Sequence, residues 1–179
     1  MDRQPVLDGE RLHLRPLRAD DWAALYAVAS DPRVWEVHPA HDRWEEPVFR
    51  AFFDEALAEG GALLAIRKDD GKVVGSSQFR PCPVRAEDIE IGWTFLAREC
   101  WGTGLNPEMK RLMLAHALAE YPRVLFRIGE TNIRSRKAIE AIGGRLTDLV
   151  EDGEYKGAPV RHVVYEIDRA SFASGPLST

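Results

Sequence analysis

The stretch Trp101-Gly102-Thr103-Gly104-Leu105-Asn106-Pro107 decides how this sequence is interpreted. It follows an apolar segment, residues 89–96, and precedes an amphipathic one, residues 107–118. Two glycines permit a tight turn and a close approach of the backbone to a ligand. Asn106 suits the N-cap of a helix and Pro107 its first position. The pattern therefore predicts a strand, a glycine turn and a helix N-terminus, an arrangement that typically binds phosphate.

Two common nucleotide-binding motifs do not fit this turn. A P-loop closes its glycine run with Lys followed by Ser or Thr, whereas here Asn106 and Pro107 follow. A dinucleotide fingerprint requires a third small residue three places after Gly104, where Pro107 stands. The remaining alternatives are another phosphate-bearing ligand and a tight connection that binds nothing.

Composition indicates one soluble globular domain. The chain has 179 residues, of which 45% are hydrophobic and 30% charged, and a formal net charge of −5. An acidic balance argues against general nucleic-acid binding. No apolar run approaches the roughly 18 residues of a membrane helix, and no signal-peptide core is apparent, so we expect a cytoplasmic protein. Cys82 and Cys100 form no CxxC pair, and we expect two reduced thiols and no metal site.

Periodicity predicts alternating helices and strands within a core of about residues 7–172, flanked by loose termini. The expected strands are residues 11–17, 62–67, 73–79, 89–95, 123–128, 145–150 and 160–167. The expected helices are residues 20–30, 46–58, 107–118 and 133–142. Residues 34–46 form a loop, and residues 69–71 a hairpin turn. We therefore predict an α/β fold (α+β by some schemes), in which about four helices flank a mixed, mostly antiparallel sheet of about seven strands.

A second group of residues, Glu130 to Gly144, helps to decide whether the glycine turn binds a phosphate-bearing ligand, and which one. Asn132, Ser135, Ile139 and Gly143 fit the pattern Asn-x-x-Ser-x-x-x-(apolar)-x-x-x-Gly. With the glycine turn, and with the early Leu14-Arg15-Pro16-Leu17 and Asp20-Asp21-Trp22, this pattern resembles the GNAT superfamily of acyl-CoA-dependent N-acetyltransferases. The likeness is greatest to the branch that includes the ribosomal-protein N-terminal acetyltransferases, and covers about residues 7–172. It implies one acyl-CoA N-acyltransferase domain over residues 1–179.

The resemblance implies acetyl-CoA as cosubstrate and a set of residues that bind it. Backbone amides of the glycine turn would hold the pyrophosphate, and Thr103 would add a hydroxyl donor. A bulge, indicated locally by Gly92, would splay the preceding strand and expose backbone groups to the pantetheine arm. The basic cluster Arg134, Arg136 and Lys137 either reaches CoA phosphates or is a solvated helix face. The expected cofactor-binding residues are Phe95, Leu96, Gly102, Thr103, Gly104, Leu105, Asn106, Asn132 and Lys137.

Transfer to an amine requires a group that removes the amine proton and a group that protonates the leaving thiolate. Glu90, between Ile89 and Ile91, is our candidate base, because burial raises the pKa of a carboxyl; the alternative is a structural ion pair. Many relatives have a Tyr where Ile139 stands, so Ser135 is the candidate acid, and its alternative is a packing role. We expect direct attack by the amine.

The acceptor side of the site is less defined by the sequence. In the resembling family, the loop after the first helix lines the acceptor site, which assigns Trp35, His38 and Trp44 to substrate binding. The acceptor is a primary amine, either a protein N-terminus or a small molecule. A homodimer fits the resemblance. The alternative function is a non-catalytic acyl-CoA-binding or sensing protein that keeps the fold.

Overall fold

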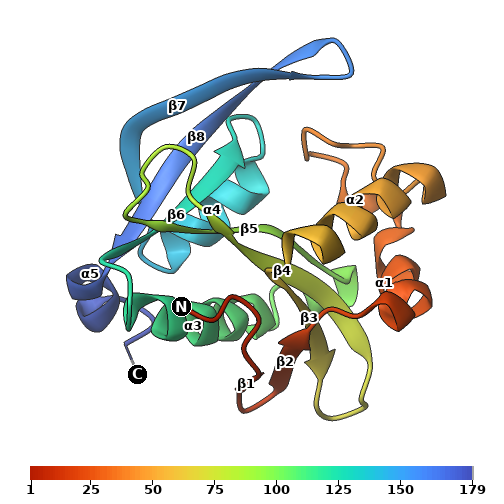
Figure 1. Cartoon of the computed structure of the whole chain (residues 1–179), viewed down its shortest axis with the longest axis horizontal. Helices are drawn as coiled ribbons and strands as arrows, with labels where there is room; N and C mark the ends of the chain where they lie inside the picture. The colour runs from red at the N-terminus through yellow and green to blue at the C-terminus, as the bar shows by residue number, and fades with distance from the viewer. Residues whose placement is uncertain (179) are drawn as a thin grey trace.

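The computed structural model describes residues 1–178 and contains one sheet of eight strands (Figure 1). The strand order is β1-β2-β3-β4-β5-β6-β8-β7. All neighbours are antiparallel except β5 and β6, which are parallel. The strands are β1 Leu7–Asp8, β2 Leu12–Pro16, β3 Ala62–Arg67, β4 Val73–Pro81, β5 Ile89–Leu96, β6 Arg123–Gly129, β7 Arg145–Tyr155 and β8 Ala158–Asp168.

Helices cover both faces of the sheet and bury two apolar clusters (Figure 1). The helices are α1 Trp22–Ala29, α2 Glu46–Glu59, α3 Leu105–Leu118, α4 Ile133–Ala141 and α5 Arg169–Ser174. Aromatic residues of α1 and α2 pack with Leu64 and Phe95 on one face. The apolar stripe of α3, including Met109 and Met113, packs with Ile139 of α4 on the other. The hydrophobic effect of these two layers holds the sheet between them.

The predicted α/β class, with a mixed and mostly antiparallel sheet, is confirmed, and residues 1–178 form eight strands and five helices where about seven and about four were expected. The extra elements are short: β1 has two residues and α5 six. The final hairpin is longer than expected, because β7 and β8 continue to a turn at Lys156 and Gly157, both with positive φ. Met1 and Leu177, expected in loose termini, pack against the core.

The start of α3 differs from the prediction by two residues. The helix begins at Leu105, and Gly104 occupies the N-cap position with φ of 85°. Asn106 is therefore the second helical residue rather than the cap, and Pro107 the third. Proline is tolerated there because the N–H groups of the first turn have no partner within a helix. Within residues 1–178, no helix has both the length and the apolar character needed to cross a membrane.

A β-bulge in β5 positions the functional site. Gln78 of β4 pairs with Gly92, but Ser76 pairs with Phe95, so Trp93 and Thr94 together oppose Ser77. At this irregularity Trp93 adopts a left-handed backbone conformation, with φ of 53°, which is strained for a bulky residue. The predicted bulge is thus confirmed, immediately after Gly92. The parallel ladder between β5 and β6 covers only Ile89 and Glu90 on β5, beyond which the two strands diverge.

Candidate active site

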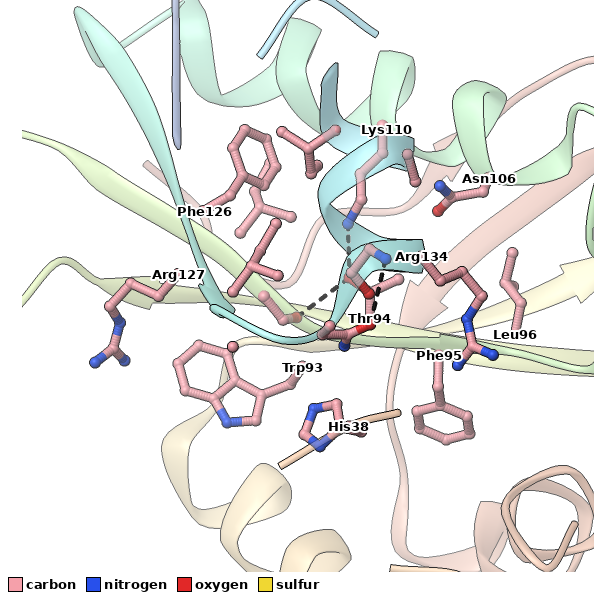
Figure 2. A pocket seen from close by; sticks show the side chains of 18 of the residues that line it. His38, Trp93, Thr94, Phe95, Leu96, Asn106, Lys110, Phe126, Arg127 and Arg134 are labelled. Atoms are coloured by element: carbon pink, nitrogen blue, oxygen red, sulfur yellow. Dashed lines mark hydrogen bonds between the residues drawn. The ribbon is translucent and has the colours of Figure 1, made fainter. Parts of the chain in front are cut away.

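A cavity of about 280 Å³ occupies the space between the diverging strands (Figure 2). It extends from Gly102 in the turn before α3 and Asn106 in the first turn of α3 to Arg127 near the end of β6 and His162 in the middle of β8. Its walls come from β5, β6, α3, α4 and the loop after α1. Eight predicted site residues line it: Trp35, His38, Phe95, Leu96, Gly102, Asn106, Asn132 and Ser135. Six do not: Trp44, Glu90, Thr103, Gly104, Leu105 and Lys137.

The turn before α3 is held in place by Arg11 and Glu108. The backbone N–H groups of Arg11 and Leu12 donate to Glu108 Oε1 at 2.8 and 3.2 Å, and the Arg11 guanidinium donates to the Thr103 carbonyl at 2.9 Å. The positive φ of Gly104 favours glycine there, and a Cβ at this position would also displace the Arg11 guanidinium, which would lie 2.8 Å away. These contacts fix the turn against β2.

Gly102 is open toward the cavity. It has φ of 71°, and a Cβ placed there would meet nothing within 4 Å. The Thr103 hydroxyl, by contrast, donates to the Cys100 carbonyl at 2.6 Å. Because a hydroxyl has one proton to donate, this bond engages that proton within the turn, and the role of Thr103 toward phosphate stays a prediction. The N–H groups of the first turn of α3 and the positive end of its dipole remain as the anion-binding elements.

Phe95 and Leu96 lie on the part of β5 that does not pair with β6. On one side they pair with Ser76 and Gly75 of β4. On the other side the ladder to β6 ends at Glu90, so no strand pairs with this edge among residues 1–178, and the Leu96 carbonyl accepts a hydrogen bond from Trp101 Nε1 at 3.1 Å. An extended ligand bearing amide groups can bind such an edge as an added strand would.

Glu90 is buried beside the cavity rather than in it. Its carboxylate oxygens accept hydrogen bonds from Arg127 Nε at 2.9 and 3.0 Å, and its side chain is 3% exposed. Burial raises its pKa, and Arg127 opposes that shift. Arg127 also binds Glu151 at 2.8 Å. The ion-pair alternative for Glu90 is therefore present in the structure, and the cavity is lined by Arg127 instead.

The N-terminus of α4 forms a second wall. Asn132 is 3% exposed and caps the helix, since its side-chain oxygen accepts from the Ser135 backbone N–H at 3.3 Å. Arg134 lies with its guanidinium 4.0 Å from the centre of the Trp101 ring. Arg136 binds the Tyr165 hydroxyl and Lys137 is exposed, so only Arg134 of the basic cluster lines the cavity.

The loop after α1 contributes two of its three expected residues. Trp35 is buried, and its indole N–H donates to the Ala29 carbonyl at 2.8 Å. His38 accepts the Ala40 N–H on Nδ1 at 2.9 Å, and burial lowers its pKa to about 3. The ring is therefore neutral, and its proton is on Nε2. Trp44 is 38% exposed and lies outside the cavity, where its carbonyl accepts the Tyr26 hydroxyl.

Two cavity residues were missed by sequence reasoning. Lys110, on α3, is 3% exposed and donates to Thr94 Oγ1 at 2.6 Å (Figure 2). Burial lowers its pKa to about 7. His162, on β8, is half-buried, and burial followed by the charge of Arg127 lowers its pKa. A sequence signal existed for Lys110, because it shares a helical stripe with the buried Leu114 and Ala117.

A second cleft adjoins the cavity. His38 and Gly129 line both, and the cleft continues between the loop after α1 and the β7–β8 hairpin. The tip of that hairpin is attached to the loop, since Asp42 accepts hydrogen bonds from the Tyr155 hydroxyl, at 2.5 Å, and from Lys156. Figure 1 shows the hairpin extending past the sheet toward this loop. The loop and the hairpin thus form the two sides of this cleft.

The bulged β5, its separation from β6 and the glycine turn at the N-terminus of α3 together define an acetyltransferase architecture. A family model described as the acetyltransferase (GNAT) domain matches residues 11–145. Since the match spans well over half of the chain, this protein belongs to the GNAT acetyltransferase family.

Solved structures show the same fold. A GCN5-related N-acetyltransferase from Brucella melitensis superposes with a TM-score of 0.78 at 20% identity, covering 96% of this chain and 81% of that one. RimJ of Mycobacterium smegmatis, in complex with CoA-disulfide, gives 0.70 at 20% identity and coverage of 93% and 86%. A ribosomal-protein-S5-alanine acetyltransferase from Vibrio fischeri gives 0.67 at 13% identity and coverage of 92% and 96%.

Proposed function

We propose that this protein transfers an acetyl group from acetyl-CoA to a primary amine by direct attack of the amine on the thioester. The observation that carries the proposal is the continuous cavity between β5 and β6, which begins at the anion-binding turn of α3 and ends at ionisable groups on β6 and β8. One substrate bound by its phosphates at the first end would present its reactive group near the second.

The cavity suits the parts of acetyl-CoA in order. The N–H groups at Gly102 and in the first turn of α3 would bind the pyrophosphate, with Arg134 adding positive charge beside Trp101. The free edge of β5 at Phe95 and Leu96 would bind the pantetheine amides. Leu105 would contribute its backbone N–H to this pyrophosphate site, while its buried side chain packs in the core.

For the amine proton, we propose His162 as the acceptor. It lines the cavity, it is neutral near pH 7 because its pKa is lowered, and no protein hydrogen bond to its ring is found within residues 1–178. Glu90 then acts through Arg127, which it holds at the cavity wall. The acceptor, a small-molecule amine or a protein N-terminus, would enter through the second cleft and pass the Nε2–H of His38.

Isothermal titration with acetyl-CoA tests the binding half of the proposal. We expect binding by the wild-type protein and its loss in Gly102→Arg, whose side chain would occupy the space that Gly102 leaves open. Gly153, on β7, also has open space around it, so Gly153→Arg is the matched control that should bind normally. Absence of binding by the wild-type protein would contradict the proposal.

Thiol release from acetyl-CoA over a panel of amines and N-terminal peptides tests the transfer half. We expect His162→Gln to lower kcat about 10²- to 10⁴-fold, the usual contribution of a positioned acid or base. Glu90→Gln should have a smaller effect. A protein that binds acetyl-CoA but acetylates none of the panel would favour the alternative function, a non-catalytic acyl-CoA-binding protein.

A further inference from the structure

Lys110 is a buried amine without a carboxylate partner. Its side chain is 3% exposed, and no Asp or Glu among residues 1–178 forms an ion pair with it. Lysines are rarely buried in this way, since the ammonium loses its hydration. The polar contacts it makes are a hydrogen bond to Thr94 Oγ1 at 2.6 Å and a cation–π approach to Phe126, 5.8 Å from the ring centre. A buried lysine left in this state requires a reason.

The position of Lys110 in the cavity supplies a reason for its burial. The residue lies one helical turn beyond Asn106, and its amine contacts Thr94 at the bulge (Figure 2). The cavity lining also includes Ile139, the position at which the resemblance places a Tyr in many relatives. The other ionisable groups of the cavity are His38 from the loop, Arg127 from β6, Arg134 from α4 and His162 from β8; none of them is a hydrogen-bond partner of Lys110.

We propose that the Lys110 ammonium donates the proton that the leaving sulfur requires when the acyl group is transferred. This inference rests on the proposed function, because it assumes a thioester in the cavity. In the step, the C–S bond breaks and its electron pair stays on sulfur, while an ammonium N–H bond breaks and the S–H bond forms. The neutral amine then regains a proton from water once the products leave.

The proton affinities of the two groups support this step. Burial brings the pKa of Lys110 to about 7, against about 8.5 for an ordinary alkyl thiol. Transfer from the ammonium to a thiolate is therefore downhill, and a sizeable fraction of the amine is protonated near neutral pH. Negative charge developing on sulfur would favour the ammonium further. Ser135, the donor candidate from the sequence, also lines the cavity, but an ordinary aliphatic hydroxyl gives up its proton far less readily.

The first experiment measures the pH dependence of kcat with an acceptor from the panel above. Because only the ammonium form of Lys110 can donate a proton, the wild-type kcat should fall up to tenfold per pH unit above about pH 7, and this alkaline limb should be absent from Lys110→Met. Thr94→Val is the matched control: it removes the hydroxyl partner of Lys110 but keeps the amine, and should keep the alkaline limb.

The second experiment measures turnover. Lys110→Met should reduce kcat about 10²- to 10⁴-fold and change the KM for acetyl-CoA much less, whereas Lys72→Met, in the exposed β3–β4 turn, should change neither. An alkaline limb retained in Lys110→Met, equal defects in Thr94→Val and Lys110→Met, or an acetyl group found on Lys110 by mass spectrometry would each overturn the proposal. If CoA fails to bind the wild-type protein, the proposed function falls with it, and the two failures are thereby distinguished.

Discussion

Glu90 and Arg127 join neighbouring strands by a buried ion pair at the wall of the cavity, with Arg127 Nε between the two carboxylate oxygens. Arg127 also packs against Trp93, 5.8 Å from the ring centre. The pair therefore links β6 to the bulged part of β5, at the point where the strands begin to diverge.

Removing one member of this pair should cost more stability than removing both. Arg127→Met leaves a buried carboxylate without its partner, for which we expect a loss of about 3–5 kcal/mol in the free energy of unfolding. Combining it with Glu90→Met should recover part of this loss. Denaturant unfolding of the two single variants and the double variant measures the coupling. Strictly additive losses would show that the pair has no energetic role.

The pair also predicts a pH dependence. Because burial raises the pKa of Glu90, the folded protein holds this proton more tightly than the unfolded chain does. The stability that this group contributes is full below its ordinary pKa of 4.5 and decreases as the pH rises through the raised value. In Glu90→Gln that part of the pH dependence should disappear from unfolding curves recorded across the acidic range.

Lys110 predicts the opposite slope at alkaline pH. Its pKa is lowered from 10.5 to about 7, so between these values the unfolded chain binds more protons than the folded one. The free energy of unfolding should therefore rise with pH across this window, relative to that of Lys110→Met, by up to about 1.4 kcal/mol per pH unit. Thermal denaturation at pH 7 and pH 10 compares the two proteins. Parallel curves would contradict the assigned burial.

Gly102 and Gly153 form a matched pair for the glycine turn. Both have open space where a Cβ would lie, but only Gly102 has a positive φ. Gly102→Ala should cost about 1–2 kcal/mol, the penalty for an L residue in left-handed backbone, and should weaken CoA binding. Gly153→Ala should do neither. Calorimetric binding and unfolding measurements on both variants test the assignment.

The attachment of the β7–β8 hairpin at Asp42 predicts a change in dynamics. Tyr155→Phe removes the hydrogen bond to this carboxylate but keeps the ring. Amide hydrogen exchange should accelerate at the hairpin tip and in the loop after α1, with a stability loss of about 1 kcal/mol. Exchange in β2 and β3 serves as the internal reference and should be unaffected.

The sequence predicted the parts of the site that depend on backbone geometry. Gly102 and Gly104 indicated the turn, and Gly92 indicated the bulge, because glycine spacing reports local conformation directly. It could not predict the partners of side chains from distant elements. Glu90 meets Arg127 only because β5 and β6 are adjacent in the sheet. The sequence also did not predict the hydrogen bond by which the Thr103 hydroxyl donates to a carbonyl within its own turn.

Lys110 and His162 show a second limit of prediction from the sequence. A lysine in an amphipathic helix ordinarily reaches water, and its place beside Leu114 and Ala117 in the stripe became informative only once the buried face of α3 was known. His162 lines the cavity because β8, the last long strand of the chain, inserts next to β6. Strand order of this kind is a property of the whole sheet, which local periodicity does not encode.

The short parallel ladder between β5 and β6 has a mechanical consequence. Two residue pairs join the first five strands of the sheet to the last three, so this ladder is the shortest one between long strands of the sheet. A ligand bound in the cavity between these strands contacts both parts of the sheet and connects them. Its binding free energy therefore adds to the cohesion between them, and an excess of ligand should raise the melting temperature and make unfolding of the two halves more concerted.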